Sequence, residues 1–96
     1  MAVPFNYLDA PLQFMQNLCG IDRKDLAWSI KSRILEVCEY QREHRDLKKK
    51  GDTPNLYQIH AKAAPADGPT HPGYWVSLLV LDRRILVTGI ELGRHD

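Results

Sequence analysis

The sequence predicts a small α+β domain in which a helical hairpin packs on a short, largely antiparallel sheet. Three observations lead to this prediction. Apolar residues recur at helical spacing in the first half of the chain and at strand-like spacing in the second, and a basic, glycine- and proline-containing break separates the halves. A length of 96 residues is usual for one domain. We therefore expect residues 1–96 to form a single domain with the order strand, helix, helix, strand, strand, strand.

The first two elements are expected to be a short strand and a short helix. Residues 3–8 alternate weakly between apolar and polar side chains, which predicts a strand. Asp9 is a suitable helix N-cap and Pro11 suits the first turn, so a helix is expected to begin here. Gly20 follows the last apolar position at helical spacing and predicts the C-terminal cap.

A second, amphipathic helix is expected from Asp22 to about Leu47. Asp22 is a good N-cap residue. The apolar positions after it recur every three or four residues, which gives one buried stripe. This stripe consists of Leu26, Ile30, Ile34 and Val37, and the same spacing continues to the polar Gln41. Because the turn between the two helices is short, we expect them to form an antiparallel hairpin.

The second half of the chain has the features of an antiparallel sheet. Strand-like segments lie at residues 55–63, 74–81 and 84–92. The last two are separated by Asp82 and Arg83, which predicts a β-hairpin. Residues 64–73 hold three prolines and two glycines and are expected to form a loop.

The composition is that of a folded protein, with 44% hydrophobic and 26% charged residues. The net charge of +1 indicates no large basic surface for nucleic acid. No apolar run approaches the ~18 residues of a membrane span, so no membrane partner is expected. Cys19 and Cys38 both fall on apolar helix positions and form no disulfide framework. We therefore expect a reducing, cytoplasmic location.

Neither a metal site nor a cofactor is expected. The four histidines, His44, His60, His71 and His95, lack the spacing of metal ligands, and neither cysteine has a ligand partner nearby. The chain also has no glycine-rich phosphate loop and no nucleophile elbow.

Two groups of polar residues are candidates for a functional site. Side chains alternate along a strand, so Gln58, His60 and Lys62 share one face that is expected to face solvent or a substrate. An ordinary polar face explains this pattern as well as a site does. Arg94 and His95 are interpreted either as a frayed end or, if the last strand lies beside the middle of the sheet, as neighbours of His60 and Lys62.

Lysines and tryptophans leave further alternatives open. Lys48, Lys49 and Lys50 suit either the solvated C-terminus of a helix or contacts to phosphates. Trp75 suits the core or a platform on which a base stacks. Trp28 lies off the apolar stripe and is a candidate for a partner-binding face.

Four segments carry a resemblance to a known family. They are Leu56–Lys62, Gly73–Ser77, Asp82–Val87 and Leu92–His95. They are similar to an L-Y-x-I-(K/R) strand, a G-Y-R-V strand start, a D-x-x-I-V-V turn and strand, and a G-(K/H)-R end. With the expected order of elements, they resemble the RelE/ParE superfamily of bacterial toxins from type II toxin–antitoxin systems. This resemblance implies the RelE/ParE-like fold.

In the ribosome-dependent branch of this family, the toxin enters the ribosomal A site and cleaves mRNA, which inhibits translation. The resemblance thus implies a metal-independent endoribonuclease, an mRNA interferase, without a cofactor. Its partners would be a cognate antitoxin, the ribosome and mRNA. The alternative is a non-enzymatic binding module on the same fold, either a ParE-like toxin that inhibits DNA gyrase or an interaction protein of a phage or plasmid.

The resemblance also assigns roles to residues. His60 and Lys62 occupy the family's basic strand, and Arg94 and His95 occupy its basic C-terminal site, so the resemblance implies that all four are catalytic residues. His95 would act as general acid or base, because a histidine titrates near neutral pH. Lys62 and Arg94 would hold phosphate oxygens. The lysines at 48–50 and Trp75 are the candidates for further RNA contacts.

Overall fold

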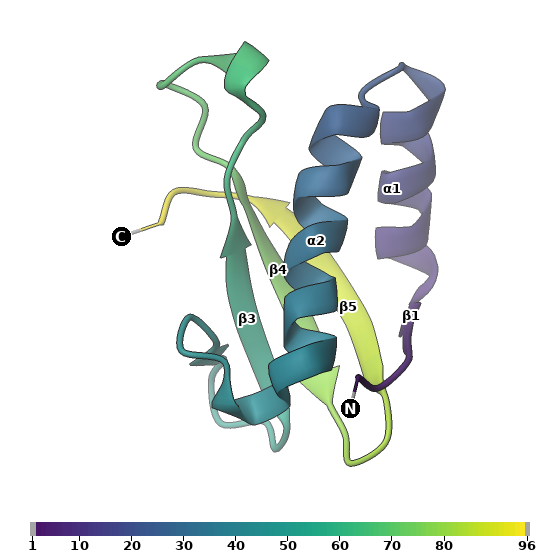
Figure 1. Cartoon of the computed structure of the whole chain (residues 1–96), viewed down its shortest axis with the longest axis vertical. Coiled ribbons are helices and arrows are strands. Elements are labelled where there is room, and N and C mark those ends of the chain that lie inside the picture. The colour runs from purple at the N-terminus through teal and green to yellow at the C-terminus, as the bar shows by residue number, and fades with distance from the viewer. Residues whose placement is uncertain (1, 96) are drawn as a thin grey trace.

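The computed structural model describes residues 2–95 and confirms the α+β class. Two helices lie side by side on one face of a five-stranded sheet, and the other face is left open (Figure 1). The helices are α1 (Asp9–Gly20) and α2 (Lys24–Tyr40). The strands are β1 (Phe5–Tyr7), β2 (Lys48–Lys49), β3 (Leu56–Ala61), β4 (Tyr74–Val80) and β5 (Ile85–Leu92). Two 3₁₀ turns, Gln41–Glu43 and Pro65–Asp67, complete the elements.

The sheet has the strand order β1-β5-β4-β3-β2. β1 pairs parallel with β5, and the other three pairings are antiparallel. The predicted first strand and the predicted β4–β5 hairpin are therefore both present. Because β3 and β5 both pair antiparallel with β4, they run in the same direction, and the chain leaves β5 at the same end of the sheet as the end of β3 (Figure 1).

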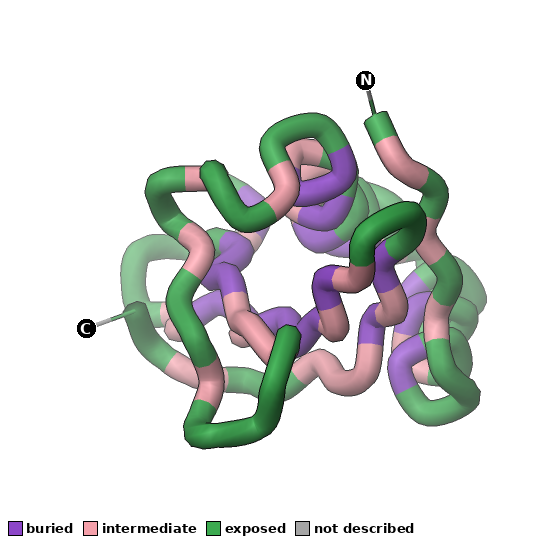
Figure 2. The backbone as a smooth tube through the Cα atoms, turned by 90° about the horizontal axis from the view of Figure 1, so that it is seen from below, coloured by how far each residue is buried: buried purple, intermediate pink, exposed green. Residues whose placement is uncertain are grey.

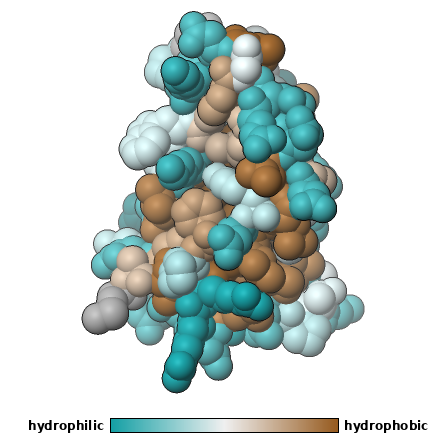
Figure 3. Space-filling model, turned by 90° about the vertical axis from the view of Figure 1, so that its right-hand side faces the viewer, coloured by the Kyte–Doolittle hydropathy of each residue, from teal (hydrophilic) through white to brown (hydrophobic). Residues whose placement is uncertain are grey.

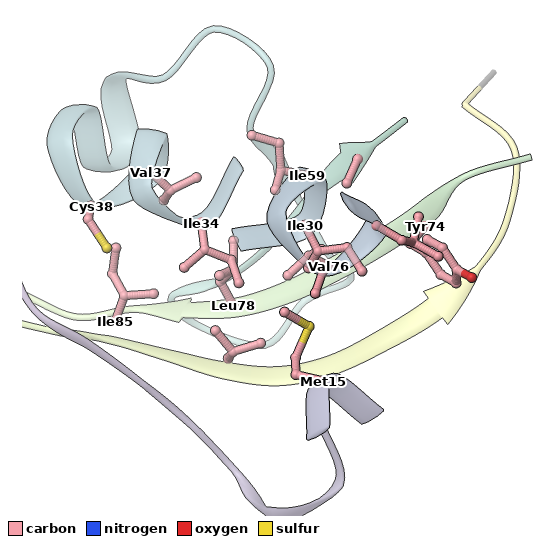
Figure 4. Packing of buried hydrophobic residues seen from close by; sticks show 14 of the residues in the cluster. Met15, Ile30, Ile34, Val37, Cys38, Ile59, Tyr74, Val76, Leu78 and Ile85 are labelled. Carbon is pink, nitrogen blue, oxygen red and sulfur yellow. The ribbon is translucent and has the colours of Figure 1, made fainter. Parts of the chain in front are cut away.

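The core lies between the helices and the covered face of the sheet. The apolar residues of the predicted stripe of α2 are buried, with Ile30, Ile34 and Val37 fully inaccessible to solvent, whereas Gln41 lies beyond the end of α2 and is partly exposed. Figure 4 shows these side chains against Val76 and Leu78 of β4. Alternate residues of β4 are buried, as strand geometry requires when one face packs on helices. Figure 2 shows that the buried positions gather in the middle of the molecule and that the connecting loops are exposed.

The predicted caps of the two helices are wrong, and Gly20, the predicted C-cap, is the last helical residue of α1. Asp9 is the first helical residue rather than a cap, and neither helix has a side-chain N-cap. Asp22 instead closes α1 through its backbone. It takes a left-handed φ of 59°, its N–H donates to the Cys19 carbonyl, and the Arg23 N–H donates to the Leu18 carbonyl. This is a Schellman motif in which Asp takes the position usually held by glycine.

The second helix is shorter than predicted. It ends at Tyr40, because Gln41 has a φ of 53° that a helix cannot continue. Arg42 then fixes the turn by donating to the Val80 carbonyl at 2.7 Å and to Asn55 at 2.9 Å. The chain thereby reverses and brings Lys48–Lys49 beside β3, so this segment is a short edge strand and no helix C-terminus.

Two smaller findings complete the fold. Cys38 is buried as expected, and burial raises the pKa of its thiol. Cys19, in contrast, is exposed, so its predicted apolar position is wrong.

Within residues 2–95, neither helix has the length and apolar character needed to cross a lipid bilayer.

The packing predicts a large cost for Ile34→Ala and a small cost for its neighbour Leu35→Ala. Ile34 is fully buried, whereas Leu35 is 40% exposed. We expect Ile34→Ala to lower the free energy of unfolding by about 2–5 kcal/mol, and Leu35→Ala by less than about 1 kcal/mol. Urea denaturation of both variants measures this difference. Equal losses would contradict the packing of α2 on the sheet.

Candidate functional site

An open cleft of about 770 Å³ lies at the end of β3. It is formed by α2, the segment at Asp46, the end of β3, the residues before β4 and the residues after β5. The four residues singled out by the family resemblance, His60, Lys62, Arg94 and His95, all line it. The structure therefore brings together two groups that lie more than thirty residues apart in the sequence.

The lining of the cleft is rich in cationic groups. Arg33, Lys62 and Arg94 each bring a positive charge, and Asp46 brings the one negative charge among the described lining residues. Arg33 donates to the Asp46 carboxylate at 3.2 Å and holds the pKa of that group below its usual value. Within residues 2–95, neither Lys62 nor Arg94 forms an ion pair. The cleft is therefore suited to an anion.

His60 is buried, contrary to the prediction that it faces solvent or a substrate. Its exposed fraction is 9%, because the rings of Trp75 and His95 cover it at centroid distances of 5.0 and 5.3 Å. Its Nε2 lies 2.8 Å from the Gly93 carbonyl oxygen and 3.0 Å from that of Pro72. Carbonyl oxygens only accept hydrogen bonds, so Nε2 carries a proton and donates to both.

Residues Gly93–His95, which we call the strap, are fixed to the end of the sheet. The Gly93 N–H donates to the Gly73 carbonyl at 3.0 Å, and the Trp75 indole N–H donates to the Arg94 carbonyl at 2.9 Å. The His95 ring stacks on Trp75, with centroids 5.6 Å apart and an angle of 25°. The interpretation of Arg94 and His95 as a frayed end is therefore wrong for these residues.

Side chains of α2 close the cleft from the helical side. β2 pairs with β3 only at Tyr57 and Gln58, which leaves the end of β3 as a sheet edge. Arg33 donates to the His60 carbonyl at 2.9 Å, and the Ser29 hydroxyl donates to the Lys62 carbonyl at 2.7 Å. These contacts satisfy carbonyls that a bare edge would expose.

Three further lining residues, Ser29, Ser32 and Arg33, were not predicted to belong to the site, because in the sequence they resemble an ordinary solvated helix face. The only signal was their three- and four-residue spacing, which places them on one side of the helix.

The loop between β3 and β4 is tied down at both ends. Near its start, Asp67 accepts two hydrogen bonds from Arg23, at 2.7 and 2.8 Å, and raises the pKa of that guanidinium. Near its end, the Gly73 N–H donates to Nδ1 of His71 at 3.0 Å. The loop thus presents His71 and Pro72 to the cleft in a defined position.

The residues proposed as further RNA contacts are split between two faces of the sheet. Lys48 lies 5.8 Å above the Trp75 ring, and Lys50 donates to the Ser77 hydroxyl at 2.8 Å. Both therefore lie on the open face, and Lys48 is next to the strap, because Trp75 donates to the Arg94 carbonyl. Lys49 pairs with Tyr57 and points to the other side, because strand side chains alternate. Trp75 is half-buried on the open face and is not part of the core cluster.

Among residues 2–95, no group of three or more histidine, cysteine or carboxylate side chains lies close enough to hold a metal ion. Comparison of the chain with protein families, curated proteins and solved structures found no match.

The strap and the loop require glycine at position 73. Gly73 has a φ of +81°, and a Cβ there would lie 2.6 Å from both the Ala61 carbonyl oxygen and the His60 ring. Gly51 has a φ of +63° but open space around it. We expect Gly51→Ala to cost only the left-handed backbone strain, about 1–2 kcal/mol.

Gly73→Ala is expected to cost clearly more, because it also displaces His60. Thermal denaturation of the two variants separates the contributions. Equal melting temperatures would contradict the close packing of Gly73 on His60.

Proposed function

We propose that this chain is a metal-independent endoribonuclease that cleaves mRNA at the ribosome, as the toxin of a toxin–antitoxin pair. The observation that carries the proposal is the cleft in which Lys62, Arg94 and His95 meet. Two cations without an ionic partner among the described residues suit a phosphodiester, and an exposed imidazole beside them suits proton transfer. The family resemblance supplies the substrate class.

The chemistry needs only groups that the cleft and the substrate offer. The 2′-oxygen of the RNA attacks the adjacent phosphorus, the bond from phosphorus to the 5′-oxygen of the next nucleotide breaks, and a 2′,3′-cyclic phosphate forms. His95 takes the proton of the 2′-hydroxyl or gives one to the leaving 5′-oxygen. Lys62 and Arg94 stabilise the extra negative charge on the phosphate oxygens in the transition state.

The surroundings of the cleft agree with a single-stranded substrate. Lys48 and Trp75 lie beside the strap on the open face of the sheet, where a cation and an aromatic ring suit a phosphate and a base. The net charge of the chain is only +1, so binding would depend on this local arrangement rather than on a general basic surface. A cytoplasmic location, where mRNA is translated, belongs to the same proposal.

A non-enzymatic binding module, for example one that inhibits gyrase, is the second candidate. It is favoured by apolar surface outside the cleft. Figure 3 shows a broad apolar area on the side of the molecule formed by α1, β1 and β5. Leu8 and Leu12 are 44% and 39% exposed, and Trp28 of α2 is 61% exposed. Exposed apolar surface of this kind is typical of protein interaction sites.

Cleavage of a labelled RNA by the purified chain in the presence of EDTA, with and without ribosomes, tests the proposed activity. We expect His95→Ala to lower the rate by about 10²–10⁴-fold, because proton transfer is lost. Lys62→Ala should lower it by about 10²–10³-fold, because charge stabilisation is lost. An RNA with a deoxyribose at the cleavage position should stay intact.

The matched control is Arg83→Ala, because Arg83 is exposed in the turn at the other end of the sheet. It should cleave at the wild-type rate. Uncut RNA under every condition would overturn the nuclease proposal. If growth arrest on expression were then relieved by Trp28→Ala and not by His95→Ala, the binding module would be favoured instead.

A further inference from the structure

His60 occupies an unusual position for a residue expected to do chemistry. Its single Nε2 proton lies between two carbonyl oxygens from different segments, that of Pro72 in the loop before β4 and that of Gly93 in the strap. The two acceptors follow His60 by 12 and 33 residues in the sequence. One side chain therefore joins three segments of the chain.

The backbone of His60 is held as firmly as its ring. Its carbonyl accepts a hydrogen bond from Arg33 at 2.9 Å, which adds α2 to the segments joined at this residue. The ring has no room to move toward Gly73, because even a Cβ there would lie 2.6 Å from Cε1. On another side the ring faces Trp75, whose indole N–H holds the Arg94 carbonyl.

This arrangement separates His60 from proton transfer. The Nε2 proton is committed to two carbonyls, and 9% exposure leaves little of the ring for a substrate to reach. His95, in contrast, is exposed and lines the same cleft. His60 is therefore a fixed hydrogen-bond donor, whereas His95 is accessible as an acid or base.

We propose that His60 is a positioning residue: it latches the strap to the sheet so that Arg94 and His95 stand at the cleft. The effect of His60 on catalysis rests on the proposed function. That His60 holds the strap to the sheet does not depend on it. This positioning role replaces the catalytic role that the family resemblance assigned to His60.

Three substitutions at position 60 test the latch. Glutamine carries an amide N–H at about the place of Nε2, so His60→Gln should keep the bond to the strap and retain RNA cleavage within about tenfold. Asparagine is too short to reach, and alanine has no donor. His60→Asn and His60→Ala should each lose about 100-fold, the effect expected when a catalytic group is displaced by about 1 Å.

The matched control is His95→Gln, which should lose activity as His95→Ala does, because an amide cannot transfer a proton. If His60→Gln were as inactive as His60→Ala, with the strap ordered in both, His60 would be a catalytic acid or base and the latch would be overturned.

A second readout does not depend on activity. Backbone ¹⁵N relaxation of the Arg94 and His95 amides should give order parameters near 0.85 in the wild type and in His60→Gln, and below about 0.6 in His60→Ala and His60→Asn. Unchanged order in both of these variants, in which no side-chain donor reaches the strap, would overturn the latch, whatever their activity. If the wild-type chain cleaves no RNA, the proposed function is wrong. The relaxation data would still show whether His60 holds the strap to the sheet.

Discussion

The geometry of the cleft depends on two hydrogen bonds of His60. Its Nε2 donates to the carbonyl oxygens of Pro72 and Gly93, at 3.0 and 2.8 Å. The bonds from Gly93 to Gly73 and from Trp75 to Arg94 extend the same attachment along the strap. Each of these groups would otherwise need water as a partner. Together they convert residues that follow the last strand into one wall of the cleft.

The opposite wall depends on the hydrophobic core. Burial of Ile30, Ile34 and Val37 fixes how α2 is rotated on the sheet. That rotation places Ser29 and Arg33 over the edge of β3, where they bind the Lys62 and His60 carbonyls. Arg33 also binds Glu36 and Asp46, so its charge is balanced within the protein. Lys62 and Arg94 remain as the cations that a bound anion would meet.

Much of the fold could be predicted from the sequence, because the dominant signals are local. The spacing of the α2 stripe and the turn at Asp82 and Arg83 each depend on a few neighbouring residues. The end of α2 could not be predicted in this way. It depends on Gln41 taking a positive φ and on Arg42 reaching the Val80 carbonyl, a contact across 38 residues. The strand at Lys48–Lys49 follows from that turn and was missed with it.

In the candidate site, too, the features that depend on neighbouring residues could be predicted, and those that depend on distant contacts could not. Alternation along β3 separated His60 and Lys62 from the apolar Ile59 and Ala61, and this separation is correct. Alternation says nothing of what covers a face, so the burial of His60 under Trp75 and His95 was not foreseen. The order of the strap could not be predicted either, since it depends on acceptors and donors from β3, β4 and the loop between them.

We propose that RNA binds in the cleft between α2 and the strap, and an NMR titration tests this proposal most directly. The ligand is a short single-stranded oligoribonucleotide whose 2′-hydroxyls are methylated, so that it cannot be cleaved. We expect the backbone amide shifts of Lys62, Arg94 and His95 to change most. Shift changes confined to Leu12 and Trp28 on the helices, or no changes at all, would contradict it.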